Sequence, residues 1–187
     1  MRNFNKIFCI GWPKTATSSL RQAFEDFGFT YNPPWNDVLC KEVYKTESNA
    51  LDYINKYDVF FTTKFERLEE LFPGSLYICT YHNPYETAFR MVKHTYNLPQ
   101  TSILTSPRPE RLQSERLFDL GWCEYENSIE KITNYYDKVF KHFFNIRDRF
   151  LILDIIKDSK KSYDNLCTFL DMPKKYDAFP HMNKNTL

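Results

Sequence analysis

The stretch KIFCIGWPKTATSSL, residues 6–20, decides the fold of this chain. It starts with an apolar run that is typical of a buried strand, and it leads into residues 16–27, whose apolar side chains recur at helical spacing. The turn between them carries Lys14 and hydroxyl side chains at positions 15, 17, 18 and 19. A helix N-terminus presents unpaired N–H groups and the positive end of the helix dipole. With a cation and hydroxyl donors beside the helix N-terminus, the sequence predicts a binding site for an oxyanion, and so a nucleotide-like ligand.

Length and composition indicate a single domain, residues 1–187, with a core of its own. Hydrophobic residues make up 42% of the chain and the net charge is only +1, so no broad basic surface points to nucleic acid. No apolar run approaches the about 20 residues of a membrane span, and no signal peptide precedes the motif, so we expect a soluble, cytoplasmic protein. Five scattered cysteines without a Cys-x-x-Cys pair favour reduced thiols over zinc or disulfides.

Strand-like and helix-like segments alternate along the rest of the chain. Strands are expected at residues 6–11, 58–63, 76–81 and 149–155. Helices are expected at residues 16–27, 47–56, 65–72, 84–96, 110–119, 122–146 and 162–170. Gly28 suits a left-handed cap after the first helix, and residues 97–109, rich in proline, are the best candidate for a lid. This alternation predicts an α/β domain whose mainly parallel sheet is covered by helices on both faces.

The turn does not match the nucleoside-triphosphate loop Gly-x-x-x-x-Gly-Lys-Ser/Thr. The order Pro-Lys-Thr-Ala-Thr-Ser-Ser at residues 13–19 instead resembles the Pro-Lys/Arg-x-Gly-Thr-Thr/Ser loop of the sulfotransferases. Further segments resemble that family in the right order: residues 71–84, 150–154, 166–170 and 179–183. The resemblance covers about residues 6–183 and implies a short, compact member with a three-layer α/β/α, P-loop nucleotide-hydrolase-like fold.

The resemblance implies transfer of a sulfuryl group from 3′-phosphoadenosine 5′-phosphosulfate (PAPS) to a hydroxyl or amine of a small-molecule or carbohydrate acceptor. The product of the donor would be 3′,5′-adenosine bisphosphate (PAP). No metal is required, because a lysine and a helix end supply the positive field. Lys14 matches the family's loop lysine, which would stabilise charge on the bridging oxygen. The cofactor-binding positions implied by the loop are Pro13, Lys14, Thr15, Ala16, Thr17, Ser18 and Ser19.

The sequence departs from the family at the loop and at the second donor contact. Ala16 stands where the family prefers glycine, and alanine avoids strain there only if φ is negative. His82 replaces the arginine that contacts the 3′-phosphate, and Arg90 stands where the family has a serine with the same task. We expect an exchange of tasks, in which Arg90 reaches the 3′-phosphate and His82 supplies a single hydrogen bond. The alternative is that Arg90 is a surface residue and the 3′-phosphate pocket is lost.

The general base has several candidates. Lys64 stands nearest the histidine of the family's Lys-Thr-His segment, and Glu66 follows two residues later. A carboxylate is a reasonable proton acceptor, whereas a lysine would need a strongly lowered pKa. His181 matches a family position near the active-site face and ranks above His94. Lys64 and Glu66 could equally be exposed residues of a helix start, and His94 could equally lie on a helix surface.

Two other functions remain open from the sequence. A small-molecule kinase would need a magnesium site, for which Asp154 is the available carboxylate, although the loop lacks the Gly-Lys-Ser/Thr pattern. A nucleotide-binding or interaction protein without catalysis would account for the changes at His82 and Arg90. Acceptor specificity is expected to lie in residues 31–46 and 97–116, whose composition favours no substrate class, and the oligomeric state is unknown.

Overall fold

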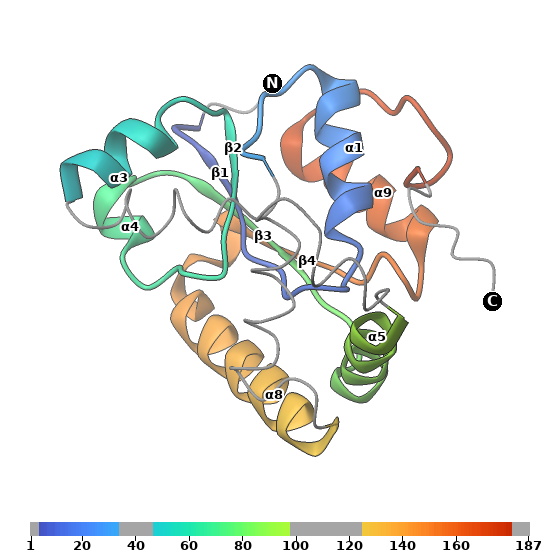
Figure 1. Cartoon of the computed structure of the whole chain (residues 1–187). Helices are drawn as coiled ribbons and strands as arrows, with labels where there is room; N and C mark the ends of the chain where they lie inside the picture. Colours follow the sequence, from blue (N-terminus) through green and yellow to red (C-terminus); the bar gives the residue numbers. More distant parts are fainter. Residues whose placement is uncertain (1–3, 34–46, 98–124, 181–187) are drawn as a thin grey trace, which may run out of the picture.

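The computed structural model describes residues 4–33, 47–97 and 125–180. In this part of the chain, four parallel strands form one sheet in the order β2-β1-β3-β4 (Figure 1). The strands are β1 (Ile7–Cys9), β2 (Val59–Phe61), β3 (Leu76–Thr80) and β4 (Phe150–Leu153). Ile7 of β1 pairs with Val59 on one side and with Leu76 on the other, so β1 lies inside the sheet. Because the strands are parallel, their carboxyl ends lie at the same edge of the sheet.

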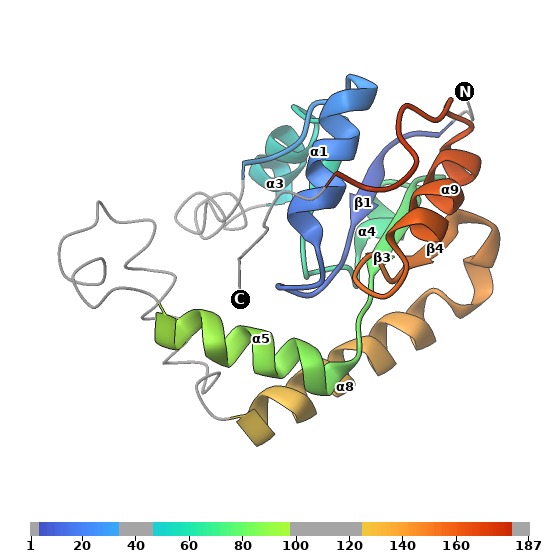
Figure 2. The same ribbon diagram turned by 90° about the vertical axis from the view of Figure 1, so that its right-hand side faces the viewer.

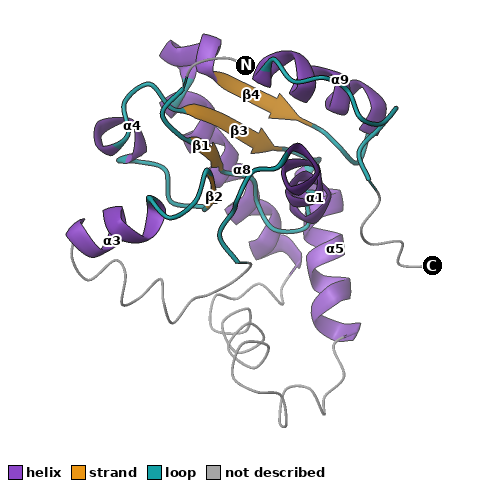
Figure 3. Cartoon of the chain, turned by 90° about the horizontal axis from the view of Figure 1, so that it is seen from above, coloured by secondary structure: helices purple, strands orange, loops and turns teal. Residues whose placement is uncertain are grey.

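Helices cover both faces of this sheet. The described helices are α1 (Thr17–Phe27), α3 (Glu47–Ile54), α4 (Leu68–Leu71), α5 (Pro84–Asn97), α8 (Tyr125–His142), α9 (Ser159–Leu170) and the 3₁₀ helix η1 (Phe144–Arg149). Helices α1 and α9 pack on one face, and α3, α4, α5 and α8 pack on the other (Figure 3). Helix α5 also lies against α8 (Figure 2). The predicted three-layer α/β arrangement with a parallel sheet is therefore confirmed.

Strands β1, β2 and β3 are almost entirely apolar because both of their faces are buried, whereas β4 lies at the edge of the sheet and leaves Ile152 45% exposed. Along β1, Ile7 and Cys9 pack towards α1 and α9, whereas Phe8 packs on the opposite side, where its ring stacks on Tyr77 with 5.8 Å between centroids. Successive side chains of a strand point to opposite faces, so a strand between two helical layers must be apolar at every position.

No helix in the described ranges is both long and apolar enough to cross a membrane.

A polar cluster closes the amino end of the sheet. The Tyr77 hydroxyl donates to Glu69 Oε2 at 2.9 Å, and Arg149 donates to both oxygens of Glu69 at 2.7 and 2.9 Å. Arg149 also donates to the Ser75 carbonyl at 3.1 Å. Hydrogen bonds from Arg149 and Tyr77 hold the pKa of Glu69 below its usual value. This cluster joins α4, β3 and η1 at the end of the sheet opposite to the strands' carboxyl ends.

Some element boundaries differ from those predicted. Helix α9 begins at Ser159 and not at residue 162, because the Asp158 side chain accepts from the Lys161 N–H at 2.9 Å and caps it. The helix predicted over residues 122–146 ends at His142 and continues as η1, with a non-helical Ile146. Gly28 adopts φ +89°, as predicted for a left-handed cap. The helix predicted at residues 110–119 lies outside the described residues.

Candidate anion-binding site

The loop between β1 and α1 has an unusual backbone. Lys14 and Ala16 adopt φ values of +67° and +68°, in the left-handed region. Ala16 is the N-cap of α1, and no side chain there accepts a hydrogen bond from the first turn. The amide groups that begin a helix need acceptors from outside the helix. The first turn of α1 also contains no acidic residue, so nothing in it neutralises the positive end of the helix dipole.

Ala16 has the backbone conformation for which glycine is preferred. The sequence allowed an unstrained alanine here only with a negative φ, and the observed value is +68°. A Cβ in the left-handed region lies close to neighbouring backbone oxygens and costs about 1–2 kcal/mol. The loop therefore contains strain that the surrounding contacts must hold.

Replacing Ala16 with glycine is expected to stabilise the protein by about 1 kcal/mol, because glycine adopts positive φ without the Cβ clash. For a chain of this size, that corresponds to a rise in Tm of about 2–4 °C, measured by thermal unfolding. The matched control is Ala23→Gly in the middle of α1, which is expected to lower Tm because glycine weakens a helix interior. A fall in Tm for both variants would contradict the strain at Ala16.

Lys14 presents a positive charge inside this turn. Its side chain is half-buried, and it forms no hydrogen bond or ion pair with another residue that the structure describes. Burial lowers the pKa of the Lys14 amine, since desolvation disfavours its charged form. A bound anion would compensate for this desolvation, so Lys14 and the uncapped turn of α1 together suit a phosphate or sulfate group.

The predicted hydroxyl residues of the loop separate into two groups. Thr15 is fully buried: its Oγ1 donates to the Trp12 carbonyl at 2.5 Å and lies 2.8 Å from Thr80 Oγ1. The Thr15 hydroxyl is thus engaged inside the protein, and only its backbone amide remains for a ligand. Pro13 is buried too, whereas Thr17 and Ser19 are partly exposed and Ser18 is exposed. The side chains accessible to an anion are therefore those of Lys14, Thr17, Ser18 and Ser19.

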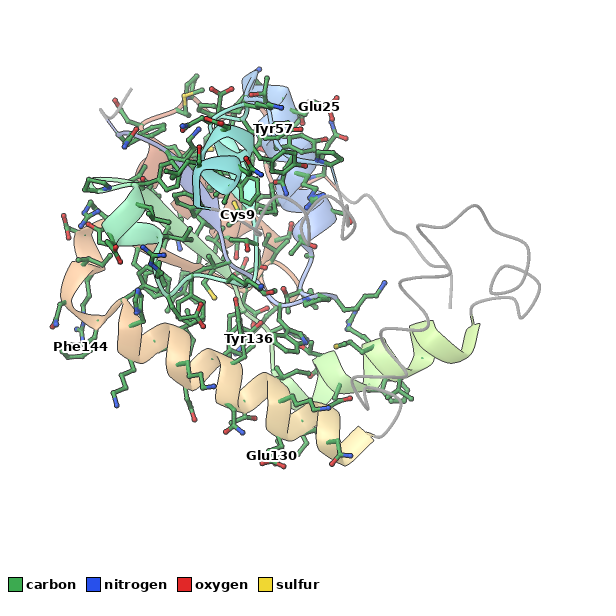
Figure 4. All side chains as sticks on the ribbon, turned by 60° about the vertical axis from the view of Figure 1, so that its left-hand side comes forward. Cys9, Glu25, Tyr57, Glu130, Tyr136 and Phe144 are labelled. Atoms are coloured by element: carbon green, nitrogen blue, oxygen red, sulfur yellow. The ribbon has the colours of Figure 1, made fainter. Side chains whose placement is uncertain are left out.

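Residues far away in the sequence hold the loop, and the sequence did not single them out. The Tyr136 hydroxyl donates to the Thr80 carbonyl at 3.0 Å, and the Tyr135 hydroxyl donates to the Ile10 carbonyl. Tyr136 points from α8 towards the sheet (Figure 4). The Trp12 indole N–H donates to the sulfur of Met91 in α5 at 3.2 Å. Met91, Tyr135 and Tyr136 lie in the helices predicted at residues 84–96 and 122–146, and nothing in the sequence linked them to the loop.

His82 is buried between two carboxylates. Its Nδ1 lies 2.9 Å from Asp154 Oδ1, and its Nε2 lies 2.7 Å from Glu86 Oε2. The single hydrogen bond that we expected His82 to offer a ligand is therefore taken up inside the protein, where the ring links α5 to the end of β4. Asp154 also accepts from the Lys157 N–H at 3.0 Å. The carboxylate that a kinase would offer to magnesium is thus part of a turn and of this link.

Arg90 remains accessible to a ligand. It is exposed on α5, one turn beyond Glu86 and on the same side of the helix. It forms no hydrogen bond or ion pair with any residue in the described ranges. The structure therefore leaves the Arg90 guanidinium as an available group near the His82 link.

The candidate bases follow β2, beside the loop. The Thr62 N–H donates to the Cys9 carbonyl at 2.9 Å, which ties the end of β2 to the end of β1. Lys64 and Glu66 come next and are both exposed, and Glu66 Oε2 accepts from the Phe65 N–H at 3.1 Å. They thus lie at the edge of the sheet from which the Lys14 loop emerges. His181 and the side chain of His94 lie outside the described residues.

The loop with its uncapped helix start and Lys14 lies at the carboxyl end of a parallel sheet, an arrangement that suits an anionic group. The family model described as "Sulfotransferase domain" matches residues 6–186, and the chain belongs to this family. A sulfotransferase from Alicyclobacillus acidocaldarius has a similar structure, with a TM-score of 0.56 and 14% sequence identity. The match covers 98% of this chain and 88% of that one, and at this identity it shows the shared fold. No curated protein matches the sequence.

Proposed function

We propose that this protein transfers a sulfuryl group from PAPS to a hydroxyl or amine of a small-molecule or carbohydrate acceptor. Membership of the sulfotransferase family supports the class of reaction. The observation that supports a donor site is that the half-buried Lys14 and the first turn of α1, which no side chain caps, belong to the same loop. Amide donors and a cation with no partner among the described residues fit the 5′-phosphosulfate of the donor.

The chemistry requires a new bond from the acceptor to sulfur while the bond from sulfur to the bridging phosphate oxygen breaks. Lys14 would neutralise the negative charge that develops on this bridging oxygen. The first-turn amides of α1, with Thr17 and Ser18, would hold the 5′-phosphate and so fix the direction of the leaving group. Charge stabilisation by Lys14 and the helix end needs no metal ion.

Glu66 is the best candidate for the base that removes the acceptor's proton. It is a carboxylate at the same edge of the sheet as Lys14, and it is exposed to an incoming acceptor. A carboxylate accepts a proton without the pKa change that Lys64 would need. Lys64 and His181 are the remaining candidates for this base.

Arg90 is proposed to bind the 3′-phosphate of the donor. Replacing it with alanine is expected to weaken PAP binding by about 10- to 100-fold, the effect of losing a charge-assisted hydrogen bond, and to leave the binding of 5′-AMP unchanged. Calorimetric titration of both nucleotides measures this difference. Lys93→Ala, on an exposed position of the same helix, is the matched control and should bind both nucleotides like the wild type. Equal PAP affinity in Arg90→Ala would show that Arg90 does not contact the 3′-phosphate.

The test of the proposed function is titration of the wild-type protein with PAP beside 5′-AMP. Tight PAP binding with a clear preference over 5′-AMP supports PAPS as the donor. Equal or absent binding contradicts it. A panel of hydroxyl and amine acceptors then tests for PAP release from PAPS.

Nucleotide binding without catalysis is a second candidate. The observation that favours it is the engagement of both His82 ring nitrogens by Asp154 and Glu86, which removes one expected donor contact. PAP binding without PAP release from PAPS across the acceptor panel would support this candidate over the enzyme.

A further inference from the structure

A buried group of hydroxyls joins the anion loop to two other elements. We name it the hydroxyl cluster: Thr15 of the loop, Thr80 at the end of β3 and Tyr136 of α8. Thr15 and Thr80 are 0% exposed and Tyr136 is 2% exposed. The cluster runs from the Tyr136 hydroxyl to the Thr80 carbonyl, from Thr80 Oγ1 to Thr15 Oγ1, and from Thr15 Oγ1 to the Trp12 carbonyl.

Tyr136 contacts the loop as well as β3. Burial raises the pKa of its hydroxyl, while the nearby polar groups of the Thr15 side chain and the Trp12 backbone act in the opposite direction. The Tyr136 hydroxyl therefore stays protonated, and it lies close to Trp12 and Thr15 of the loop. Its neighbour Tyr135 donates to the Ile10 carbonyl, so consecutive tyrosines of α8 hold the ends of β1 and β3.

The backbone that this cluster holds is strained. Residues with positive φ other than glycine persist only when surrounding contacts determine their conformation. Lys14 and Ala16 are such residues, and they flank Thr15, whose side chain is anchored in the cluster. The anchor at Thr15 thus lies between the two left-handed residues of the loop, directly before the first turn of α1.

We infer that Tyr136 is a positioning residue, which acts through Thr80 and Thr15 to hold the Lys14–Ala16 backbone in its anion-binding conformation. Its effect on the donor rests on the proposed function. Its effect on the loop backbone does not, and it can be measured without a ligand.

The Tyr136 ring has contacts that do not need the hydroxyl. It stacks on Phe140 at 5.9 Å and meets Tyr81 at 4.8 Å between centroids. Tyr136→Phe keeps this packing and removes only the hydroxyl. Tyr77→Phe is a matched control, because Tyr77 is equally buried and its hydroxyl bonds Glu69 at the opposite end of the sheet.

The experiment compares wild type, Tyr136→Phe and Tyr77→Phe at a temperature where all three are folded. Hydrogen exchange of the peptide covering residues 11–20 is expected to be about tenfold faster in Tyr136→Phe, because loss of one buried hydrogen bond favours local opening, and unchanged in Tyr77→Phe. PAP affinity, measured by calorimetry, is expected to fall by about 3- to 10-fold in Tyr136→Phe only, the effect of one buried hydrogen bond.

Thr80 supplies an independent pair of variants. Thr80→Val removes the hydroxyl but keeps the branched shape, and Thr80→Ser keeps the hydroxyl. We expect faster exchange in the first and near wild-type exchange in the second. Equal exchange of residues 11–20 in Tyr136→Phe and Tyr77→Phe would overturn the inference. Absence of PAP binding by the wild type would instead overturn the proposed donor, and the exchange data would still decide the positioning effect.

Discussion

Replacing Lys14 with methionine is expected to slow sulfuryl transfer by about 100- to 1,000-fold, the usual effect of removing one group that stabilises transition-state charge. Methionine keeps an unbranched side chain that reaches as far as the Cε atom of lysine, with sulfur in place of one methylene, and it lacks the ammonium group. The measurement is the rate of PAP release from PAPS with an acceptor that the wild type uses. Lys138→Met, at an exposed position of α8, is the matched control and should keep the wild-type rate.

The same variant is expected to be as stable as the wild type, or slightly more stable. Burial lowers the pKa of the Lys14 amine, which means that the folded state disfavours its charge relative to the unfolded state. At neutral pH the charged amine therefore destabilises the fold, and methionine removes this cost. A large loss of activity together with an unchanged or raised Tm would separate a functional lysine from a structural one. Loss of Tm along with activity would contradict this assignment.

Replacing Gly11 with alanine is expected to reduce the free energy of unfolding by about 3 kcal/mol or more. A Cβ at this position would lie 1.6 Å from Thr80 Oγ1, 2.8 Å from Thr80 Cβ and 3.0 Å from the Thr80 backbone nitrogen. Thr80 cannot move away easily, because it belongs to a buried strand paired with β4. Displacing its hydroxyl would also break the bond to Thr15.

Urea unfolding measures this loss, with Gly28→Ala as the control. Gly28 has φ +89° and a Cβ added there would meet nothing within 4 Å, so alanine at this position adds backbone strain alone, about 1 kcal/mol. The difference between the two variants isolates the contact with Thr80. Equal decreases in the free energy of unfolding would contradict a stability cost from the contact between residue 11 and Thr80.

Patterns within short stretches of sequence predicted the elements that depend on local physics. The apolar run before the turn predicted β1, the helical spacing of apolar residues predicted α1, and Gly28 predicted its C-terminal cap. The apolar strands predicted a parallel sheet, because strands covered on both faces are typically continuous apolar runs. The loop was also predictable, since hydroxyl residues, a lysine and a helix start are adjacent in the chain.

The parts of the site that the sequence did not predict depend on contacts between distant residues. Thr15 lies 65 positions from Thr80, and His82 lies 72 positions from Asp154. The residues next to Thr15 in the sequence did not indicate that its hydroxyl would be buried against Thr80. The residues next to His82 did not indicate that Asp154 would contact its ring. The positive φ of Ala16 is likewise set by the packing around the loop and not by the preference of alanine.

The order of the strands explains the place of the candidate anion site. The chain leaves β1 for β2 on one side and later adds β3 on the other side of β1, followed by β4. Connections therefore run in opposite directions from the boundary between β1 and β3, which is a topological switch point, and open parallel sheets bind ligands in the crevice at such a point. Gly11 and Thr80 meet at this boundary. Substitutions in the loop can thus change the chemistry of the candidate site, while its location stays set by the connectivity of the sheet.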